Sequence, residues 1–178
     1  MSRPAGTKHR IIVTARELFL RRGVQRTSLQ EIAAALGITK PALYYHFSSR
    51  EALVRAIVGP LVDRTEAFLL AHEALGGVEP RALLERYFDF RHEHREDLPL
   101  MLVETTTLAE LGLLDAVDAW RERLAVLLVG PAAPLDRAVR AAMALGGIQD
   151  CVLRFPDVPA AELRTAAVDA ACAALGVD

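Results

Sequence analysis

An all-α fold of about nine helices is predicted by three features of this sequence. Alanine and leucine dominate the composition, and runs of valine, isoleucine and threonine are scarce. Apolar residues recur at helical spacing along most of the chain, between breaks such as Gly76-Gly77 and Gly130-Pro131. The hydrophobic content of 52% excludes a disordered chain, and 178 residues correspond to one or two domains.

The stretch from Thr27 to Leu53 predicts a pair of short helices joined by a tight turn. Ser28 and Glu31 have the spacing of a capping box, in which each side chain binds a backbone N–H of the other residue. Gly37 supplies the left-handed conformation that ends a helix. The first helix is therefore expected over about residues 28–36, with an apolar face made of Leu29, Ile32, Ala33 and Leu36.

The second helix of the pair is expected over about residues 40–47. Thr39 is its predicted cap, and Pro41 is tolerated because it falls in the first helical turn. Two helices with a short turn that contains glycine form a helix-turn-helix. The first helix of the chain, expected over about residues 8–22, should brace this pair in a three-helix unit.

The second helix has an unusual surface. Only Leu43 and Phe47 form an obvious buried pair, which leaves a lysine, two tyrosines and a histidine on the remaining faces. Hydrogen-bonding groups on flat apolar side chains suit contact with phosphates and base edges in a major groove. The alternative is that both tyrosines are ordinary half-buried residues at the edge of a core.

The run from about Ala15 to Leu53 resembles the DNA-binding domain of the TetR family of bacterial regulators. The resemblance rests on Ala15, Phe19, Gly23, Thr27, Ile32-Ala33, Leu36-Gly37-Ile38, Leu43-Tyr44-Tyr45-His46-Phe47 and Arg50-Glu51-Ala52-Leu53. It implies a homodimeric repressor that binds double-stranded operator DNA and responds to a small-molecule effector. The residues expected to contact DNA are Thr27, Ser28, Thr39, Lys40, Pro41, Ala42, Tyr44, Tyr45, His46 and Arg50.

The distribution of charge agrees with a nucleic-acid partner for the first part of the chain only. The net charge is −2, but residues 1–55 carry ten lysines and arginines against three acidic residues. The remainder carries eleven basic residues against twenty acidic ones. A basic segment beside an acidic one indicates that a polyanion binds the basic segment.

A domain boundary is expected near residue 50, which gives a helix-turn-helix domain at 1–50 and a ligand-binding and dimerisation domain at 51–178. A helix that begins near Arg50 should connect the two domains. Gly59-Pro60 is expected to interrupt or kink it, because a proline inside a helix clashes with the preceding turn. The later helices are expected over about residues 80–94, 99–112, 113–129, 134–154 and 159–175.

The TetR resemblance implies a ligand cavity within the second domain. Aromatic and thioether side chains with a few hydrogen-bonding groups are typical of a small-molecule site. Paired charges are scarce at inward positions, which favours a mostly apolar ligand. Ordinary core packing is the alternative for each residue. The candidates are Tyr87, Phe88, Arg91, Met101, Thr105, Trp120, Met143 and Gln149.

The resemblance also implies a dimer interface, for which the last two helices are the candidates. Small residues recur on one face of each helix, and small residues allow two helices to approach closely. The alternative is packing within one subunit. The predicted interface residues are Ala138, Ala142, Gly146, Ala167, Ala171 and Ala174.

Enzymatic activity is not expected, because the sequence has no glycine-rich phosphate loop, no G-x-S-x-G motif and no metal-ligand cluster. His92 and His94 lie two positions apart, so a helix points them to different sides. No cofactor, metal or membrane partner is expected, and the absence of a signal peptide predicts a cytoplasmic protein. A DNA-binding module without any ligand and, less favoured, a helical enzyme fused to a DNA-binding segment are the alternatives.

Overall fold

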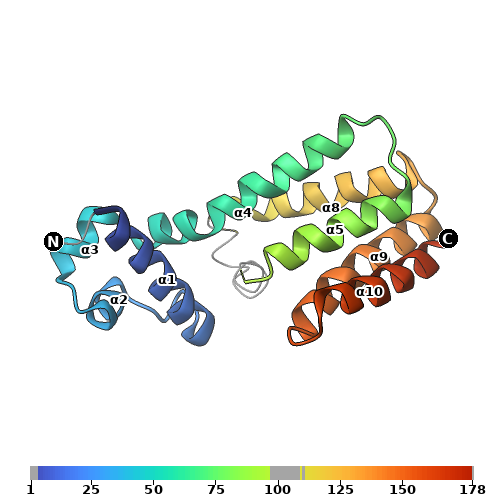
Figure 1. Cartoon of the computed structure of the whole chain (residues 1–178). Helices are drawn as coiled ribbons and strands as arrows, with labels where there is room; N and C mark the ends of the chain where they lie inside the picture. Colours follow the sequence, from blue (N-terminus) through green and yellow to red (C-terminus); the bar gives the residue numbers. More distant parts are fainter. Residues whose placement is uncertain (1–3, 97–108, 110, 178) are drawn as a thin grey trace. The chain divides into compact units, whose positions relative to one another are not determined.

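A computed structural model describes residues 4–96, 109 and 111–177, and the all-α class is confirmed (Figure 1). The predicted helix at 99–112 lies almost wholly outside the described residues. The first helix begins at Pro4, earlier than predicted. The eight helices of the described part are α1 (Pro4–Arg22), α2 (Leu29–Leu36), α3 (Lys40–His46), α4 (Arg50–Glu73), α5 (Pro80–Glu93), α8 (Leu114–Val129), α9 (Leu135–Arg154) and α10 (Ala160–Leu175).

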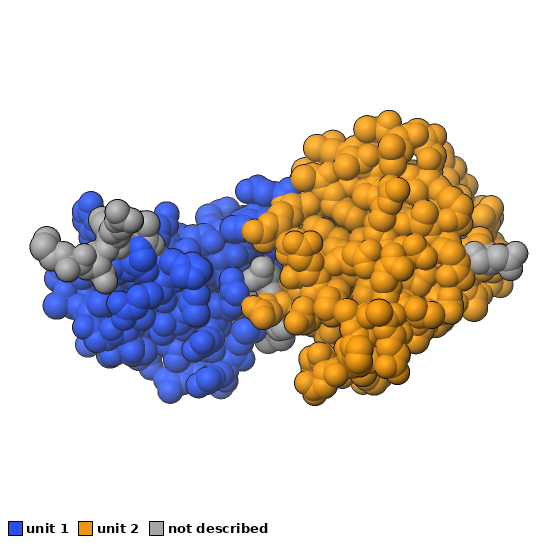
Figure 2. All heavy atoms as spheres, viewed as in Figure 1, with its two compact units in different colours: residues 1–63, 99–114 blue, residues 64–98, 115–178 orange. Residues whose placement is uncertain are grey.

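The chain divides into two compact units, coloured separately in Figure 2. Of the described residues, unit 1 holds 4–63, 109 and 111–114, and unit 2 holds 64–96 and 115–177. The division between the units falls inside α4, after Asp63, whereas the sequence placed it near residue 50. The reason is that the first half of α4 supplies core residues to unit 1, among them Leu53, Val54 and Val58.

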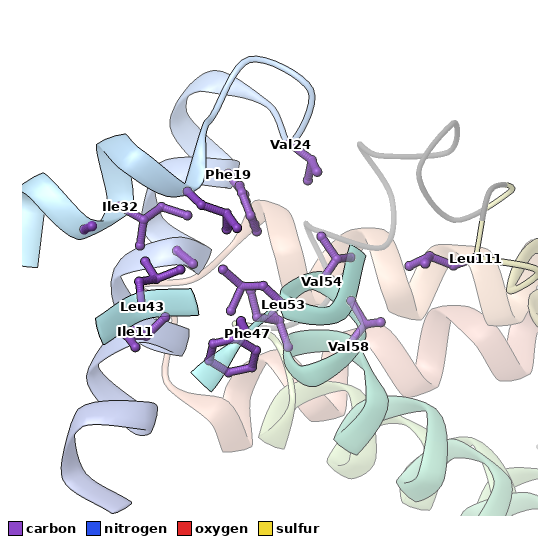
Figure 3. Close-up of a cluster of buried hydrophobic side chains, with 14 residues drawn as sticks. Ile11, Phe19, Val24, Ile32, Leu43, Phe47, Leu53, Val54, Val58 and Leu111 are labelled. Carbon is purple, nitrogen blue, oxygen red and sulfur yellow. The ribbon is translucent and has the colours of Figure 1, made fainter. Parts of the chain in front are cut away.

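Unit 1 is built on one apolar core to which each of its helices contributes (Figure 3). Ile11 and Phe19 of α1 meet Ile32 of α2 and Leu43 of α3, and all four are almost completely buried. Helices of eight and seven residues are unstable alone in water, so α2 and α3 depend on this packing. Each such side chain contributes about 1.5–3 kcal/mol when fully buried.

The segment just before α8 also belongs to the core of unit 1. Leu111 is buried there beside Val54 and Val58 (Figure 3). The Arg55 guanidinium on α4 donates to the Leu111 carbonyl oxygen at 3.2 Å. Unit 1 therefore includes a piece of chain from outside the helix-turn-helix sequence, which composition and motifs did not indicate.

Helix α4 is continuous over 24 residues, so Gly59-Pro60 does not interrupt it, and of the two predicted effects only a kink remains a prediction. Proline removes one backbone donor and disfavours the helical conformation before it. Val58 and Leu61, on either side of the pair, are buried, and their packing holds the helix through the proline. Among the described residues, no helix is both long and apolar enough to cross a membrane.

Unit 2 consists of α5, α9 and α10 packed together, with α8 joined to the second half of α4. Arg123 of α8 makes the join. Its guanidinium donates to Glu66 at 2.8 and 2.9 Å and to Glu73 at 2.7 and 2.8 Å. The Trp120 indole N–H donates to the same Glu66 carboxylate at 3.0 Å. A planar guanidinium that binds two carboxylates fixes the spacing of the two helices.

This cluster gives a prediction about stability at low pH. Hydrogen bonds from Arg123 and then Trp120 hold the pKa of Glu66 below its usual value, and Arg123 likewise lowers the pKa of Glu73. A carboxyl with a lowered folded-state pKa stabilises the fold above about pH 4.3, the ordinary glutamate pKa. That contribution is lost as pH falls through the folded-state pKa.

Arg123→Met should therefore lower the thermal unfolding temperature at pH 7 more than at pH 3. Arg121→Met is the matched control, because Arg121 lies on the same helix in an exposed pair with Asp118 at 3.4 Å. Exposed pairs contribute little, so the control should unfold like the wild type at both pH values. Equal destabilisation by Arg123→Met at pH 3 and pH 7 would contradict the assignment.

Candidate DNA interface and small-molecule pocket

The capping box predicted at the start of α2 is confirmed. The Ser28 hydroxyl accepts from the Glu31 backbone N–H at 3.2 Å, and the Glu31 carboxylate accepts from the Ser28 backbone N–H at 2.8 Å. The Ser28 backbone N–H is the main cause that lowers the pKa of Glu31. Gly37 ends the helix with a φ of 65°, as predicted, and turns the chain into α3. The cap and the glycine set the angle between the two helices.

Helix α3 presents a row of exposed residues on the side away from the core. Leu43 and the following Phe47 are buried, so the opposite face is solvent-exposed. Thr39 caps the helix, accepting from the Ala42 backbone N–H at 3.3 Å. The predicted contact residues that are exposed on this surface are Thr39, Lys40, Pro41, Ala42, Tyr44 and Tyr45.

The two tyrosines differ in their surroundings. Tyr45 is 84% exposed. Among the ring contacts between described residues, it has one, with the half-buried His46 ring. The two rings meet edge-on, with 5.2 Å between their centroids. Tyr44 is 43% exposed, and the Lys40 ammonium lies over its ring at 5.6 Å from the centroid. Tyr45 is too exposed for the alternative that both tyrosines are half-buried residues at the edge of a core. These exposures leave two phenol hydroxyls and an ammonium on one short helix.

Besides Ser28, whose hydroxyl donates to the Glu31 carboxylate at 2.8 Å, two of the predicted contact residues are held by the protein itself. Thr27 is 1% exposed, and its hydroxyl donates to the Gly23 carbonyl at 2.9 Å. Arg50 is half-buried and donates to the loop between α1 and α2. Both side chains therefore shape this loop. Arg26 and Gln30, which the sequence reasoning did not select, are exposed on either side of Ser28.

A short helix with exposed hydrogen-bonding and basic groups, set by a tight turn against a second helix, defines a helix-turn-helix DNA-binding protein. Residues 11–57 match the family model described as "Bacterial regulatory proteins, tetR family". Residues 11–57 therefore carry the DNA-binding segment of a TetR-family transcriptional regulator.

Relatives and solved structures agree with this assignment. The regulator YerO of Bacillus subtilis (strain 168) is 35% identical over 106 residues, which are 54% of this chain and 35% of YerO. The repressor BepR of Brucella suis biovar 1 (strain 1330) is 32% identical over 82 residues, 46% of this chain and 39% of BepR. The chain thus spans little more than a third of the length of these curated relatives.

The similarity of fold extends much further than the similarity of sequence. The crystal structure of PfmR, a TetR-family regulator from Thermus thermophilus, covers 90% of this chain and is itself covered to 96%, with a TM-score of 0.64 and 26% identity. Both units of this chain therefore have the architecture found in TetR regulators.

Unit 2 contains a pocket of about 340 Å³ between α5, α8 and α9. Of the predicted ligand-binding residues, Tyr87 and Gln149 line it. Most of the lining is apolar, with the Arg121 guanidinium, the Gln149 amide and the Tyr87 phenol as polar groups. The other lining residues, Leu124, Ala125, Ala142, Leu145 and Gly146, were not predicted for this role.

The remaining predicted ligand residues lie elsewhere. Phe88 is buried, and Trp120 points its N–H at Glu66. Arg91 lies over the Tyr87 ring at 5.3 Å from the centroid, so it contacts a lining residue without lining the pocket itself. Met143 is 66% exposed on the outer face of α9. Met101 and Thr105 lie outside the described residues.

The predicted interface residues fall into two groups. Ala142 and Gly146 are exposed on α9 and also line the pocket, and Ala138 and Ala174 are half-buried. Ala167 and Ala171 are buried inside unit 2, where packing within the subunit already uses them. Three exposed alanines of α10 lie one position away from the predicted ones, at Ala166, Ala170 and Ala173.

The outer face of α9 carries large apolar side chains in addition to small residues. Leu135 is 79% exposed, and Val139 and Met143 follow at intervals of four residues. Residues spaced by four lie on one line along a helix. Together with these three exposed alanines of α10 they form what we name the outer apolar face: Leu135, Val139, Met143, Ala166, Ala170 and Ala173.

Proposed function

We propose that this protein is a homodimeric repressor, released from operator DNA when a small, mostly apolar molecule binds unit 2. The observation that carries the proposal is the exposed row on α3 in one unit, together with a mostly apolar pocket in the other. BepR is named a transcriptional repressor, which supports repression over activation for this protein. Its place of action is then the cytoplasm, where bacterial DNA lies.

Two copies of α3 would enter successive major grooves on one side of the duplex. Tyr44, Tyr45 and Lys40 would meet bases and phosphates, because their polar atoms are exposed on one short helix. Thr39, whose hydroxyl accepts the cap bond, would donate its O–H to a phosphate, whereas both donors of Ser28 bind the Glu31 carboxylate. Pro41, Ala42 and His46 would complete the surface. We give Thr27 and Arg50 a supporting role, since their polar atoms bind the protein.

DNA binding of this kind should depend steeply on salt. With a duplex selected from a random pool, log affinity should fall with log salt at a slope of about −0.9 for each phosphate neutralised. Lys40→Met should make that slope shallower by about 0.9 in each subunit. Tyr45→Ala should leave the slope unchanged and lower the affinity about three- to tenfold per subunit, as expected for the loss of one hydrogen bond.

Glu17→Ala is the control, since Glu17 is exposed on α1, outside the recognition helix. Because Tyr45 is 84% exposed, its variant should unfold at the wild-type temperature. A wild-type affinity that does not change with salt would contradict the DNA-binding surface. Normal affinity of Tyr45→Ala would remove Tyr45 from it.

The pocket supports an apolar effector with at least one polar group. Leu124 and Leu145 provide apolar walls, while Gln149 and Arg121 offer hydrogen-bond donors. Release of DNA requires that the effector bind the released form more tightly than the DNA-bound form. Its chemical identity follows from screening compounds for both a rise in unfolding temperature and loss of DNA binding.

The outer apolar face supports dimerisation through α9 and α10. Leu135, Val139 and Met143 form a line of exposed apolar side chains on α9, which is typical of a surface that binds a partner. Gly146 and Gly147 weaken a helix interior, and a side chain at either position would meet nothing within the subunit. Close approach of a second copy explains both features. An isologous four-helix bundle would hold the two α3 helices at operator spacing.

A DNA-binding regulator without a small-molecule effector is the second candidate. It would bind DNA with unchanged affinity in the presence of every compound that stabilises the protein. The pocket favours the first candidate, because its walls come from three helices of unit 2 and none of the DNA-contacting residues takes part.

A further inference from the structure

Arg50, at the start of α4, is bonded to the loop that joins α1 to α2. Its Nη1 donates to the Gln25 carbonyl oxygen at 3.2 Å and to the Val24 carbonyl oxygen at 3.5 Å. Its Nη2 donates to the Gln25 side-chain oxygen at 2.7 Å. Its Nε lies 4.0 Å from the Glu51 carboxylate. All three guanidinium nitrogens thus have a partner within the protein.

A guanidinium with these partners is poorly suited to reach a phosphate. Moving it to DNA would break three hydrogen bonds, and two backbone carbonyl oxygens would lose a donor. The bond to Gln25 Oε1 is the shortest of the three and joins two side chains far apart in the sequence. The bonds to the Gln25 backbone and side chain require a planar guanidinium, which can donate in two directions at once.

The loop from Gly23 to Ser28 leads directly into the DNA-facing part of unit 1. Val24 and Thr27 are buried and fix its inner side, and the Thr27 hydroxyl closes back onto Gly23. Gln25 and Arg26 are on its exposed side. Arg50 therefore restrains the exposed side of the loop at Gln25, immediately before the Ser28 cap of α2.

We propose that Arg50 is a positioning residue for DNA binding, which holds the Gly23–Ser28 loop in the bound conformation and makes no contact with DNA. This rests on the proposed DNA surface and assigns Arg50 a role within it. A loop already ordered in the free protein costs no ordering when DNA binds, so the restraint raises affinity without adding a charge contact.

The test compares Arg50→Lys with Arg50→Met in a salt titration on a selected duplex. Lysine keeps the charge but cannot donate to the loop in two directions, so both variants should lose about ten- to a hundredfold in affinity. Both should keep the wild-type salt slope. Lys40→Met, a change at an exposed position, is the control that should make the slope shallower. Near-normal binding by Arg50→Lys, with a shallower slope in Arg50→Met, would overturn the proposal.

A second measurement does not require DNA. Amide hydrogen exchange at residues 24–28 should become faster in Arg50→Lys, while exchange in α3 stays at the wild-type rate. Unchanged exchange in the loop would overturn the proposal whether or not the protein binds DNA. If the wild type shows no salt-dependent binding but loop exchange is faster in Arg50→Lys, the proposed function is overturned and only the restraint of the loop by Arg50 stands.

Gln25→Leu serves if an Arg50 variant does not fold, because Gln25 lies on the exposed side of the loop. It should speed loop exchange and weaken DNA binding without changing the salt slope. In the Arg50→Lys background the same change should cost less affinity than in the wild type, since the two side chains act through one bond. Full additivity of the two losses would contradict a shared role.

Discussion

Met143→Arg should convert the protein into a folded monomer with greatly weakened operator binding. Met143 is central in the outer apolar face and 66% exposed in the single subunit, so arginine is tolerated there without a partner. In a dimer the arginine would be buried unpaired at the closest approach of two helices. Loss of the second half-site should lower operator affinity by about 10²- to 10⁴-fold. Sedimentation and a binding titration measure the two effects.

The choice of Met143 separates dimerisation from effector binding. Ala142 is also on the exposed side of α9, but it lines the pocket, so arginine there would change both properties. Ala119→Arg, on the exposed side of α8, is the matched control and should stay dimeric. A Met143→Arg protein that sediments as a dimer would place the interface elsewhere. A monomeric variant with normal operator affinity would show that dimerisation is not needed for binding.

Ala125→Phe should make the protein much less sensitive to effector while leaving DNA binding intact. Ala125 lines the pocket from α8 and is half-buried, so a phenyl ring there would occupy ligand space. Overfilling a packed site costs about 1–3 kcal/mol, which corresponds to a loss of effector affinity of roughly five- to a hundredfold. Release of labelled operator by a compound found in the screen measures the response.

Ala119→Phe is the control for this experiment, because it adds the same ring to the same helix outside the pocket. It should respond to the compound like the wild type. Normal release of DNA from Ala125→Phe would show that the effector binds at another place in unit 2. Loss of DNA binding without any compound would show that the change disturbs the fold.

The helix-turn-helix could be predicted from the sequence because its signals are local. Ser28 and Glu31 cap α2 through bonds within four residues, and Gly37 ends the helix through its own backbone conformation. The burial of Leu43 and Phe47 follows from helical spacing. The same reasoning gave the limits of α9 and α10 to within a residue, because proline precedes each of them.

The pocket and the roles of single side chains could not be predicted, because they depend on which helices meet. Arg121, Leu124 and Ala125 gain a common role only when α8 lies beside α9. Trp120 has the pattern of a ligand residue, yet its N–H is bound by Glu66, more than fifty positions away in sequence. Arg50 and Thr27 were predicted to contact DNA, because a local sequence pattern does not show that both side chains form hydrogen bonds to the loop between α1 and α2.

The sequence by itself therefore determined the helical class, the helix-turn-helix and its likeness to the TetR family. Caps, turns and apolar periodicity act over a few residues, and their energies do not depend on distant chain. Only the tertiary structure decided that α4 runs unbroken through Pro60, that Leu111 joins the core of unit 1 and that Ala167 and Ala171 face inward. Each of these depends on burial against residues far away in the sequence, and a periodic pattern shows that a face is buried without showing against what.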